Sequence, residues 1–192
     1  MSNALSALQG AKFDGLVKVA DAGLQGMITL RGDFADAKLQ AAVKEATGQN
    51  LPQQRAMALQ GDTGVAWMSP DELLLLVPYA EAHACVARLR AALAGTHHMV
   101  ENVSDARAFI ALSGADGLVR EVLAKVVPVD MDPQHMPQGQ LRRTKLAQVA
   151  AAIWMQAPGE ARVVCFRSVG TYAYDVLCTV AAPNSAVGFY AS

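Results

Sequence analysis

The stretch Ile28-Thr-Leu-Arg-Gly32 and, 82 residues later, the stretch Ile110-Ala-Leu-Ser-Gly114 carry the same residue pattern. Each begins with apolar residues typical of a strand and ends at a glycine, as a strand that leads into a turn does. A segment with apolar residues at helical spacing follows each stretch. The sequence therefore predicts two similar halves, each built around one of these strands.

The first half is expected within residues 15–104, after an N-terminal arm of residues 1–14. Its apolar patterns predict an order β-α-β-β-α-β, which is the split βαβ arrangement. The strands are expected at 24–30, 65–69, 72–77 and 99–103, and the helices at 36–48 and 80–95, with Gly48 and Gly95 as their stops.

The second half is expected within residues 105–192 and starts the same order again. Asp116 is predicted to cap its first helix, and Pro128 to end it. Further strands are expected within 144–155 and 162–167, before a last helix capped by Ser168. The fold class is thus α+β, with two similar split βαβ-type halves packed together.

Composition excludes several classes of protein. Hydrophobic residues make up 53% of the 192 residues and charged residues only 17%, which is not the composition of a disordered chain. The net charge of −1 gives no field that would attract nucleic acid or an anionic membrane. No apolar run is long enough to span a bilayer, and no secretory signal is visible. Three cysteines without a CxxC pattern favour a reducing cytoplasm.

Four stretches, in this order along the chain, resemble the gamma subunit family of heterotetrameric sarcosine oxidase. They are Trp67-Met-Ser-Pro-Asp-Glu-Leu-Leu-Leu75, the stretch from Val103-Ser-Asp-Ala-Arg107 to Ser113-Gly114, Gly139-Gln-Leu-Arg-Arg-Thr-Lys-Leu146, and Phe166-Arg-Ser168. The similarity covers about residues 20–182 of the chain. The family often has an aromatic residue where this chain has Leu73, so packing against that strand is expected to differ.

The resemblance implies a cytoplasmic complex of four different subunits that oxidises sarcosine to glycine, releases hydrogen peroxide and passes a one-carbon unit to tetrahydrofolate. It implies FAD, FMN and NAD in the large alpha and beta subunits, zinc in the small delta subunit, and no cofactor on this chain. It also implies a relationship to the folate-binding module of the glycine-cleavage aminomethyltransferases. The chain would then be a noncatalytic assembly subunit.

The alternative interpretation is a stand-alone protein that binds folate or transfers an aminomethyl group. Such a protein needs a carboxylate that faces a deep pocket. The acidic pair Asp71 and Glu72 follows Pro70 in a predicted turn, but neighbouring strand residues point to opposite faces and do not share a proton site. The turn is therefore interpreted as structural, with Trp67 as a core anchor whose replacement by alanine would cost about 3–5 kcal/mol if it is fully buried.

Other reactive residue types give no stronger site. His135 stands near Asp130 and Asp132, but zinc requires three or four ligands in a defined geometry, and solvated loop residues are the default interpretation. His83, His97 and His98 are expected on a polar helix side and in a loop, and Cys165 and Cys178 as buried, unreactive thiols.

A possible anion site lies at Gly114-Ala-Asp-Gly117, where a strand enters a helix. This turn lacks the three-glycine spacing of a dinucleotide loop and places Asp116 where the anion would lie. We therefore predict no catalytic, cofactor-binding or metal-ligating residue on this chain.

One charge cluster stands out from the neutral background. Residues 142–167 hold five cations against the single anion Glu160, a balance of +4; the cations are Arg142, Arg143, Lys145, Arg162 and Arg167. Arginine suits planar carboxylate recognition, so the cluster could contact an acidic partner surface or a folate glutamate tail. A solvated strand face is the other interpretation, and the sequence leaves both open.

Overall fold

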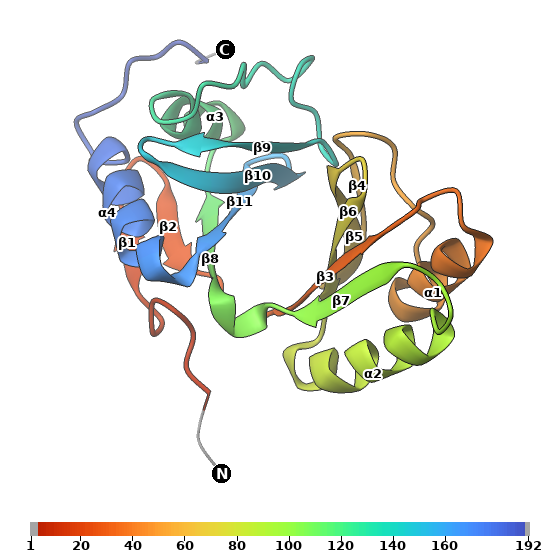
Figure 1. Cartoon of the computed structure of the whole chain (residues 1–192). Coiled ribbons are helices and arrows are strands. Elements are labelled where there is room, and N and C mark those ends of the chain that lie inside the picture. Colours follow the sequence, from red (N-terminus) through yellow and green to blue (C-terminus); the bar gives the residue numbers. More distant parts are fainter. Residues whose placement is uncertain (1–3, 191–192) are drawn as a thin grey trace. The chain divides into compact units, whose positions relative to one another are not determined.

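A computed structural model describes residues 4–190 and divides the chain into two compact units. One unit is the continuous segment 25–104, here called the inserted unit. The other joins the residues before 25 to the residues from 105 onward and is called the two-segment unit. Figure 1 shows that each unit has its own sheet and its own pair of longer helices. No helix of the described residues is long and apolar enough to cross a membrane.

The inserted unit contains an antiparallel sheet with the strand order β4-β5-β6-β3-β7. Its strands are β3 (Gly26–Gly32), β4 (Met57–Gln60), β5 (Thr63–Ser69), β6 (Glu72–Val77) and β7 (His98–Asn102). The helices α1 (Ala37–Thr47) and α2 (Ala82–Ala92) bury their apolar residues against one face of the sheet, and a short 3₁₀ helix η1 (Tyr79–Glu81) precedes α2. The core of this unit therefore lies between the sheet and its two helices.

Residues beside helix α1 determine where the helix begins and ends. The side chain of Asp36 accepts a hydrogen bond of 2.8 Å from the Lys38 amide, which satisfies one of the free N–H groups of the first turn. Gly48 follows the helix at φ 71°, a left-handed conformation that glycine adopts without steric cost, and its N–H reaches the Lys44 carbonyl. The predicted stop at Gly48 is confirmed.

The two-segment unit contains a second antiparallel sheet, with the order β1-β2-β8-β11-β10-β9. Its strands are β1 (Lys12–Asp14), β2 (Lys18–Asp21), β8 (Arg107–Ser113), β9 (Leu141–Leu146), β10 (Val149–Ala157) and β11 (Glu160–Phe166). The helices α3 (Asp116–Ala124) and α4 (Gly170–Val180) pack on one face of this sheet, and the 3₁₀ helices η2 (Ser104–Ala106) and η3 (Arg167–Val169) precede β8 and α4.

The predicted repeat is present in both sheets. Strand β3 lies between β6 and β7, and β8 lies in the same way between β11 and β2. Ile28 and Leu30 are fully buried in one core, and Ile110 and Leu112, 82 residues later, are fully buried in the other. The second neighbours of these two strands differ in origin, because β7 follows α2 in the chain whereas β2 comes from the segment before the inserted unit.

The repeat extends to the hairpins beside these strands. Ser69-Pro-Asp-Glu72 joins β5 to β6 and Ala157-Pro-Gly-Glu160 joins β10 to β11, each beside a register shift that marks a β-bulge. Proline occupies the same turn position in both, where its fixed φ favours the turn. The amide of Gly32 donates to the Asp71 carbonyl over 3.1 Å, and that of Gly114 to the Gly159 carbonyl over 3.0 Å. Each hairpin is thereby tied to the end of its central strand.

The strands differ from the sequence analysis in their assignment as well as in their exact ends. Residues 15–24 were assigned there to the first half, but β2 pairs with β8 and lies in the two-segment unit. The segment 144–155 is a hairpin of β9 and β10, because Ala147 has a positive φ of 49° that turns the chain back. The short edge strands β1 and β4 were not predicted, and β1 lies within the expected N-terminal arm and pairs with β2.

Two predicted helix caps are wrong. Ala115 and Val169 are the N-cap residues of α3 and α4, and neither makes a side-chain capping bond. The Asp116 carboxylate instead binds the Arg120 side chain and the Gly159 amide, and Ser168 lies within η3. Helix α3 also ends at Ala124, before the stop predicted at Pro128.

The core role predicted for Trp67 requires a correction as well. Trp67 is only half-buried, because it forms the last strand pair before the β-bulge, close to the end of its hairpin. Trp154 is the tryptophan that is 1% exposed, and its ring stacks on Phe109 with centroids 5.8 Å apart. Replacing Trp67 therefore removes less buried surface than the sequence analysis expects.

Pairing of β2 with β8 gives the first testable prediction. Val19 on β2 is fully buried and lies opposite Leu112, so Val19→Asp would place an unpaired carboxylate in the core. We expect a loss of more than about 3 kcal/mol of unfolding free energy in urea titrations. The matched control is Lys18→Thr at the neighbouring exposed position, which should change stability by less than about 0.5 kcal/mol. Equal stability of the two variants would contradict the role of β2.

Candidate functional site

Helix α3 carries two adjacent charged residues that are buried, the buried charged residues of the part of the chain that the structure describes. Arg120 is 5% exposed and Glu121 is 3% exposed. Each has an oppositely charged residue one helical turn away, with Nε of Arg120 at 2.7 Å from Asp116 and Nζ of Lys125 at 3.3 Å from Glu121. Buried ions are costly unless they are paired and hydrogen-bonded, so the partners of these four residues define what the group does.

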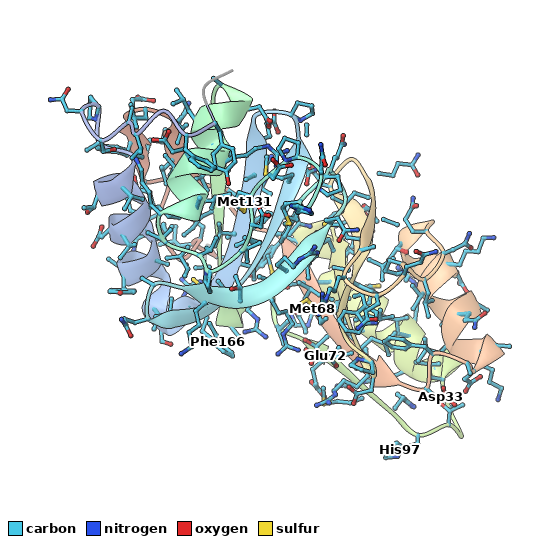
Figure 2. The ribbon with its side chains drawn as sticks, turned by 90° about the horizontal axis from the view of Figure 1, so that it is seen from above. Asp33, Met68, Glu72, His97, Met131 and Phe166 are labelled. Atoms are coloured by element: carbon cyan, nitrogen blue, oxygen red, sulfur yellow. The ribbon has the colours of Figure 1, made fainter. Side chains whose placement is uncertain are left out.

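Arg120 binds the loop that follows α3. Its Nη1 donates to the carbonyl oxygens of Met131 and Met136, at 2.8 Å and 3.0 Å. Both methionines are fully buried in the core of the unit, and Figure 2 labels Met131. The guanidinium group thus holds two turns of an irregular loop over the helix, while the Asp116 carboxylate compensates its charge.

Glu121 and Lys125 bind the segment after α4. The two carboxylate oxygens of Glu121 accept hydrogen bonds of 2.7 Å from the amides of Val187 and Gly188. The Lys125 ammonium group donates to the carbonyl oxygens of Val180 and Ser185, at 3.1 Å and 2.6 Å. This ion pair therefore fixes the course of residues 180–188 against α3.

The two carboxylates of α3 are held in their ionised form. The amide of Val187 contributes most to lowering the pKa of Glu121; burial opposes it, and the Gly188 amide and Lys125 add to the lowering. For Asp116, burial is the largest effect and would raise the pKa, but the hydrogen bonds from Arg120 and Gly159 outweigh it and the pKa is lowered. Neither carboxyl group is poised to exchange a proton near neutral pH.

The predicted turn at Pro70 has structural partners. Asp71 accepts hydrogen bonds of 2.6 Å from Arg31 Nη2 and 2.7 Å from Ser69 Oγ, and both bonds hold its pKa below the usual value, the Ser69 bond most. It borders an open hollow of about 480 Å³ at one end of the inserted unit, where Figure 2 labels Asp33 and His97. The hollow is lined by Arg31, Gly32, Asp33, Asp71, His97, His98 and Met99.

The histidines and the acidic loop do not form a metal site in the described part of the chain. His135 pairs with Asp130 alone, Nδ1 to Oδ2 at 2.6 Å, and both side chains are more than half exposed. Among residues 4–190 no three His, Cys, Asp or Glu side chains come together as a metal site requires. His83 and His97 are exposed, and His98 lies in β7 instead of the predicted loop.

The cysteine thiols stay protonated. Burial raises the pKa of Cys165 to about 11, although the charge of Arg107 opposes it. Burial also raises the pKa of the half-buried Cys178, beside Tyr174 on α4. A protonated thiol is a poor nucleophile, so neither residue is suited to covalent catalysis.

The strand-to-helix turn at residues 114–117 does not fit a dinucleotide or a phosphate. Asp116 places its carboxylate at the start of α3 and binds the Gly159 amide there. The carbonyl of Tyr190 lies close to Gly117, where a Cβ atom would meet it. The N-terminal end of α3 is therefore covered by hydrogen-bond acceptors of the protein itself, and these acceptors repel an anion.

The five cations of the basic cluster have different surroundings. Arg142 turns back to the carbonyl of His135 and to Gln140, and Arg162 is half-buried beside Glu160. Arg167 donates to the carbonyl of Leu5. Arg143 and Lys145 are exposed on β9, an edge strand of the sheet. The structure thus separates the cluster instead of forming one site from it.

The sequence analysis missed the charged group on α3. The sequence holds a signal, because Asp116 and Arg120, and likewise Glu121 and Lys125, have the i,i+4 spacing of helical ion pairs. That spacing is normally found on solvated helix faces. The burial of Arg120 and Glu121 depends instead on the loops that cover α3.

Comparison with known proteins identifies the family of the chain. The model of the sarcosine oxidase gamma subunit family matches residues 31–183. The chain is 33% identical over 142 residues to the sarcosine oxidase subunit gamma of an Arthrobacter species, covering 72% of this chain and 66% of that protein. It is 34% identical over 117 residues to the same subunit of Corynebacterium sp. strain P-1, covering 59% and 55%. These matches span less than two thirds of the relatives' own lengths.

Two solved structures share the fold. One is a chain of the heterotetrameric sarcosine oxidase from Corynebacterium sp. U-96 in complex with pyrrole 2-carboxylate, with a TM-score of 0.78 and 24% identity over 92% of this chain and 90% of that one. The other is the glycine cleavage system aminomethyltransferase T from Bartonella henselae, with a TM-score of 0.56 and 16% identity over 80% and 43%. The predicted α+β fold of aminomethyltransferase type is confirmed.

The ionised Glu121 gives a prediction for stability against pH. Its folded pKa lies below the ordinary value of 4.5, so its stabilisation is complete above about pH 4.5 and is lost as the pH falls through the folded value. Glu121→Gln should lower the unfolding free energy at pH 7 by about 1–3 kcal/mol, because two amides lose a charged acceptor. The difference from the parent should shrink when urea titrations are repeated at lower pH. Glu45→Gln, at an exposed position on α1, is the control and should change little.

Proposed function

The chain belongs to the sarcosine oxidase gamma subunit family, and we propose on this basis that it is the gamma subunit of a heterotetrameric sarcosine oxidase. In this role it assembles with the large alpha and beta subunits and the small delta subunit. The complex oxidises sarcosine to glycine in the cytoplasm, forms hydrogen peroxide and passes the one-carbon unit to tetrahydrofolate. FAD, FMN and NAD belong to the large subunits in this proposal, and zinc to the delta subunit.

We further propose that this chain supports assembly and does not perform the chemistry. The observation that carries this proposal is the use of the buried charged residues on α3. Arg120 and Glu121, the two buried charged side chains among the described residues, bind the chain's own backbone amides and carbonyls. Acid-base chemistry uses groups whose pKa is moved toward the working pH, and here the pKa of Glu121 is moved away from it.

A stand-alone folate-binding or aminomethyl-transferring protein is the second candidate. The shared fold with aminomethyltransferase T favours it, but fold alone does not transfer an activity. This function needs a carboxylate free to hold a ligand in a deep pocket. The hollow beside Asp71 is open, and the Asp71 carboxylate is already bound by Arg31 and Ser69. The assembly role therefore has the better support.

Coexpression tests the assembly role. The alpha, beta and delta subunits are produced with and without this chain, and yield, flavin content and sarcosine-dependent peroxide formation are measured. We expect a clear loss of assembled, flavin-containing complex without the chain, because a permanent interface of about 2,000 Å² or more would be left exposed. Unchanged assembly and activity in its absence would contradict the proposal.

The isolated chain provides a separate test of the noncatalytic role. It should be colourless after purification and inactive toward sarcosine, and calorimetry should detect no binding of tetrahydrofolate. Flavin bound in a one-to-one ratio would refute the noncatalytic role. Tight tetrahydrofolate binding would favour the second candidate.

A further inference from the structure

One end of the two-segment sheet presents a row of cationic and aromatic side chains. The strand registers place Lys145 opposite Ala150 and Phe166 opposite Arg107, and the pairing of Ala151 with Cys165 brings Ala150 beside Phe166. The row crosses the four adjacent strands β9, β10, β11 and β8. We call these four residues, Lys145, Ala150, Phe166 and Arg107, the basic-aromatic row.

The row lies at one end of the sheet, on the face opposite α3 and α4, and farther along this face Leu141 and Trp154 are buried. Side chains alternate between the faces of a strand, and the neighbours Cys165 and Ala108 point into the core under the helices. Phe166 is 51% exposed, and Lys145 and Ala150 are exposed as well. Figure 2 labels Phe166 beside the sheet of this unit. A large apolar ring at this degree of exposure does not contribute to the unit's own core.

Arg107 and Phe166 form a preorganised pair. The guanidinium carbon of Arg107 lies 4.2 Å from the centre of the Phe166 ring, which is a cation–π contact. The planar guanidinium group of arginine is suited to recognition of a carboxylate. Arginine and aromatic residues are also the types that most often carry binding energy in protein interfaces.

The charge around the row is positive. Arg143 is exposed two residues before Lys145 on β9, and Arg167 directly follows Phe166. With Arg107 and Lys145 these make four cations, against Asp105 near the start of β8. The surface is thus complementary to a chain segment that carries carboxylates around an apolar residue.

We propose that the basic-aromatic row is where an acidic segment of a partner subunit of the oxidase docks. Its carboxylates bind Lys145 and Arg107, with Arg143 and Arg167 at the sides, and an apolar side chain covers Phe166. This inference rests on the proposed function, because it names the surface through which the subunit assembles. It assigns three cations of the basic cluster, Arg143, Lys145 and Arg167, to a partner surface, whereas Arg142 and Arg162 bind groups of the chain itself.

Charge reversal and ring removal test the proposal in the complete complex. Tagged full-length chain is coexpressed with the other three subunits, and the amount of partner recovered per chain is measured at low and high salt. The variants are Lys145→Glu and Phe166→Ala. Their matched controls are Lys12→Glu, an exposed lysine on the opposite edge strand β1, and Tyr172→Ala, a 40% exposed tyrosine on α4. Circular dichroism verifies that every variant is folded.

We expect both row variants to reduce recovery of the partner subunits by about tenfold, and both controls to stay within about twofold of the parent. The deficit of Lys145→Glu should shrink at high salt, because screening weakens the repulsion it introduces. Recovery equal to that of the controls for both folded row variants would overturn the docking surface alone. Failure of the parent chain to recover any partner would overturn the proposed function, and the docking surface with it.

Discussion

The pairing of β2 with β8 is the constraint on which the structure depends. A central strand needs a partner on each side, since unpaired backbone groups at its edge are costly when buried. β11 supplies one side of β8, but the described residues after α4, up to 190, supply no strand for the other. β2, from the segment before the inserted unit, fills that place and buries Val19 against the core. In the inserted unit, the corresponding strand β3 pairs instead with that unit's own last strand, β7.

This arrangement leaves long irregular segments around α3, and buried charge holds them in place. The loop through Met131 and Met136 and the segment 180–188 have few regular backbone bonds, so their carbonyls and amides need other partners. Arg120, Glu121 and Lys125 provide these partners from one helix. Polar residues used in this way fix a conformation, which suits a subunit that presents a defined surface to other chains.

The sequence predicted the repeated elements because they depend on local patterns. Ile28 and Ile110 begin equivalent strands, and Gly48 ends α1 as its left-handed conformation requires. The caps predicted at Asp116 and Ser168 are wrong because tertiary partners decide which bonds a polar side chain makes. The hairpin at Ala147 was missed because alanine carries no turn signal, although its φ is positive there.

The sequence by itself thus determined the α+β class, the two equivalent strands, and the family resemblance carried by motifs in their order. These features follow from hydrophobic period and turn chemistry, which act over a few residues. Only the tertiary structure decided that β2 belongs to the sheet of β8 and that Arg120 and Glu121 are buried. It alone brought Lys145, Phe166 and Arg107 from three strands into one row. Such groupings depend on strand register and on packing between distant segments, which no local pattern specifies.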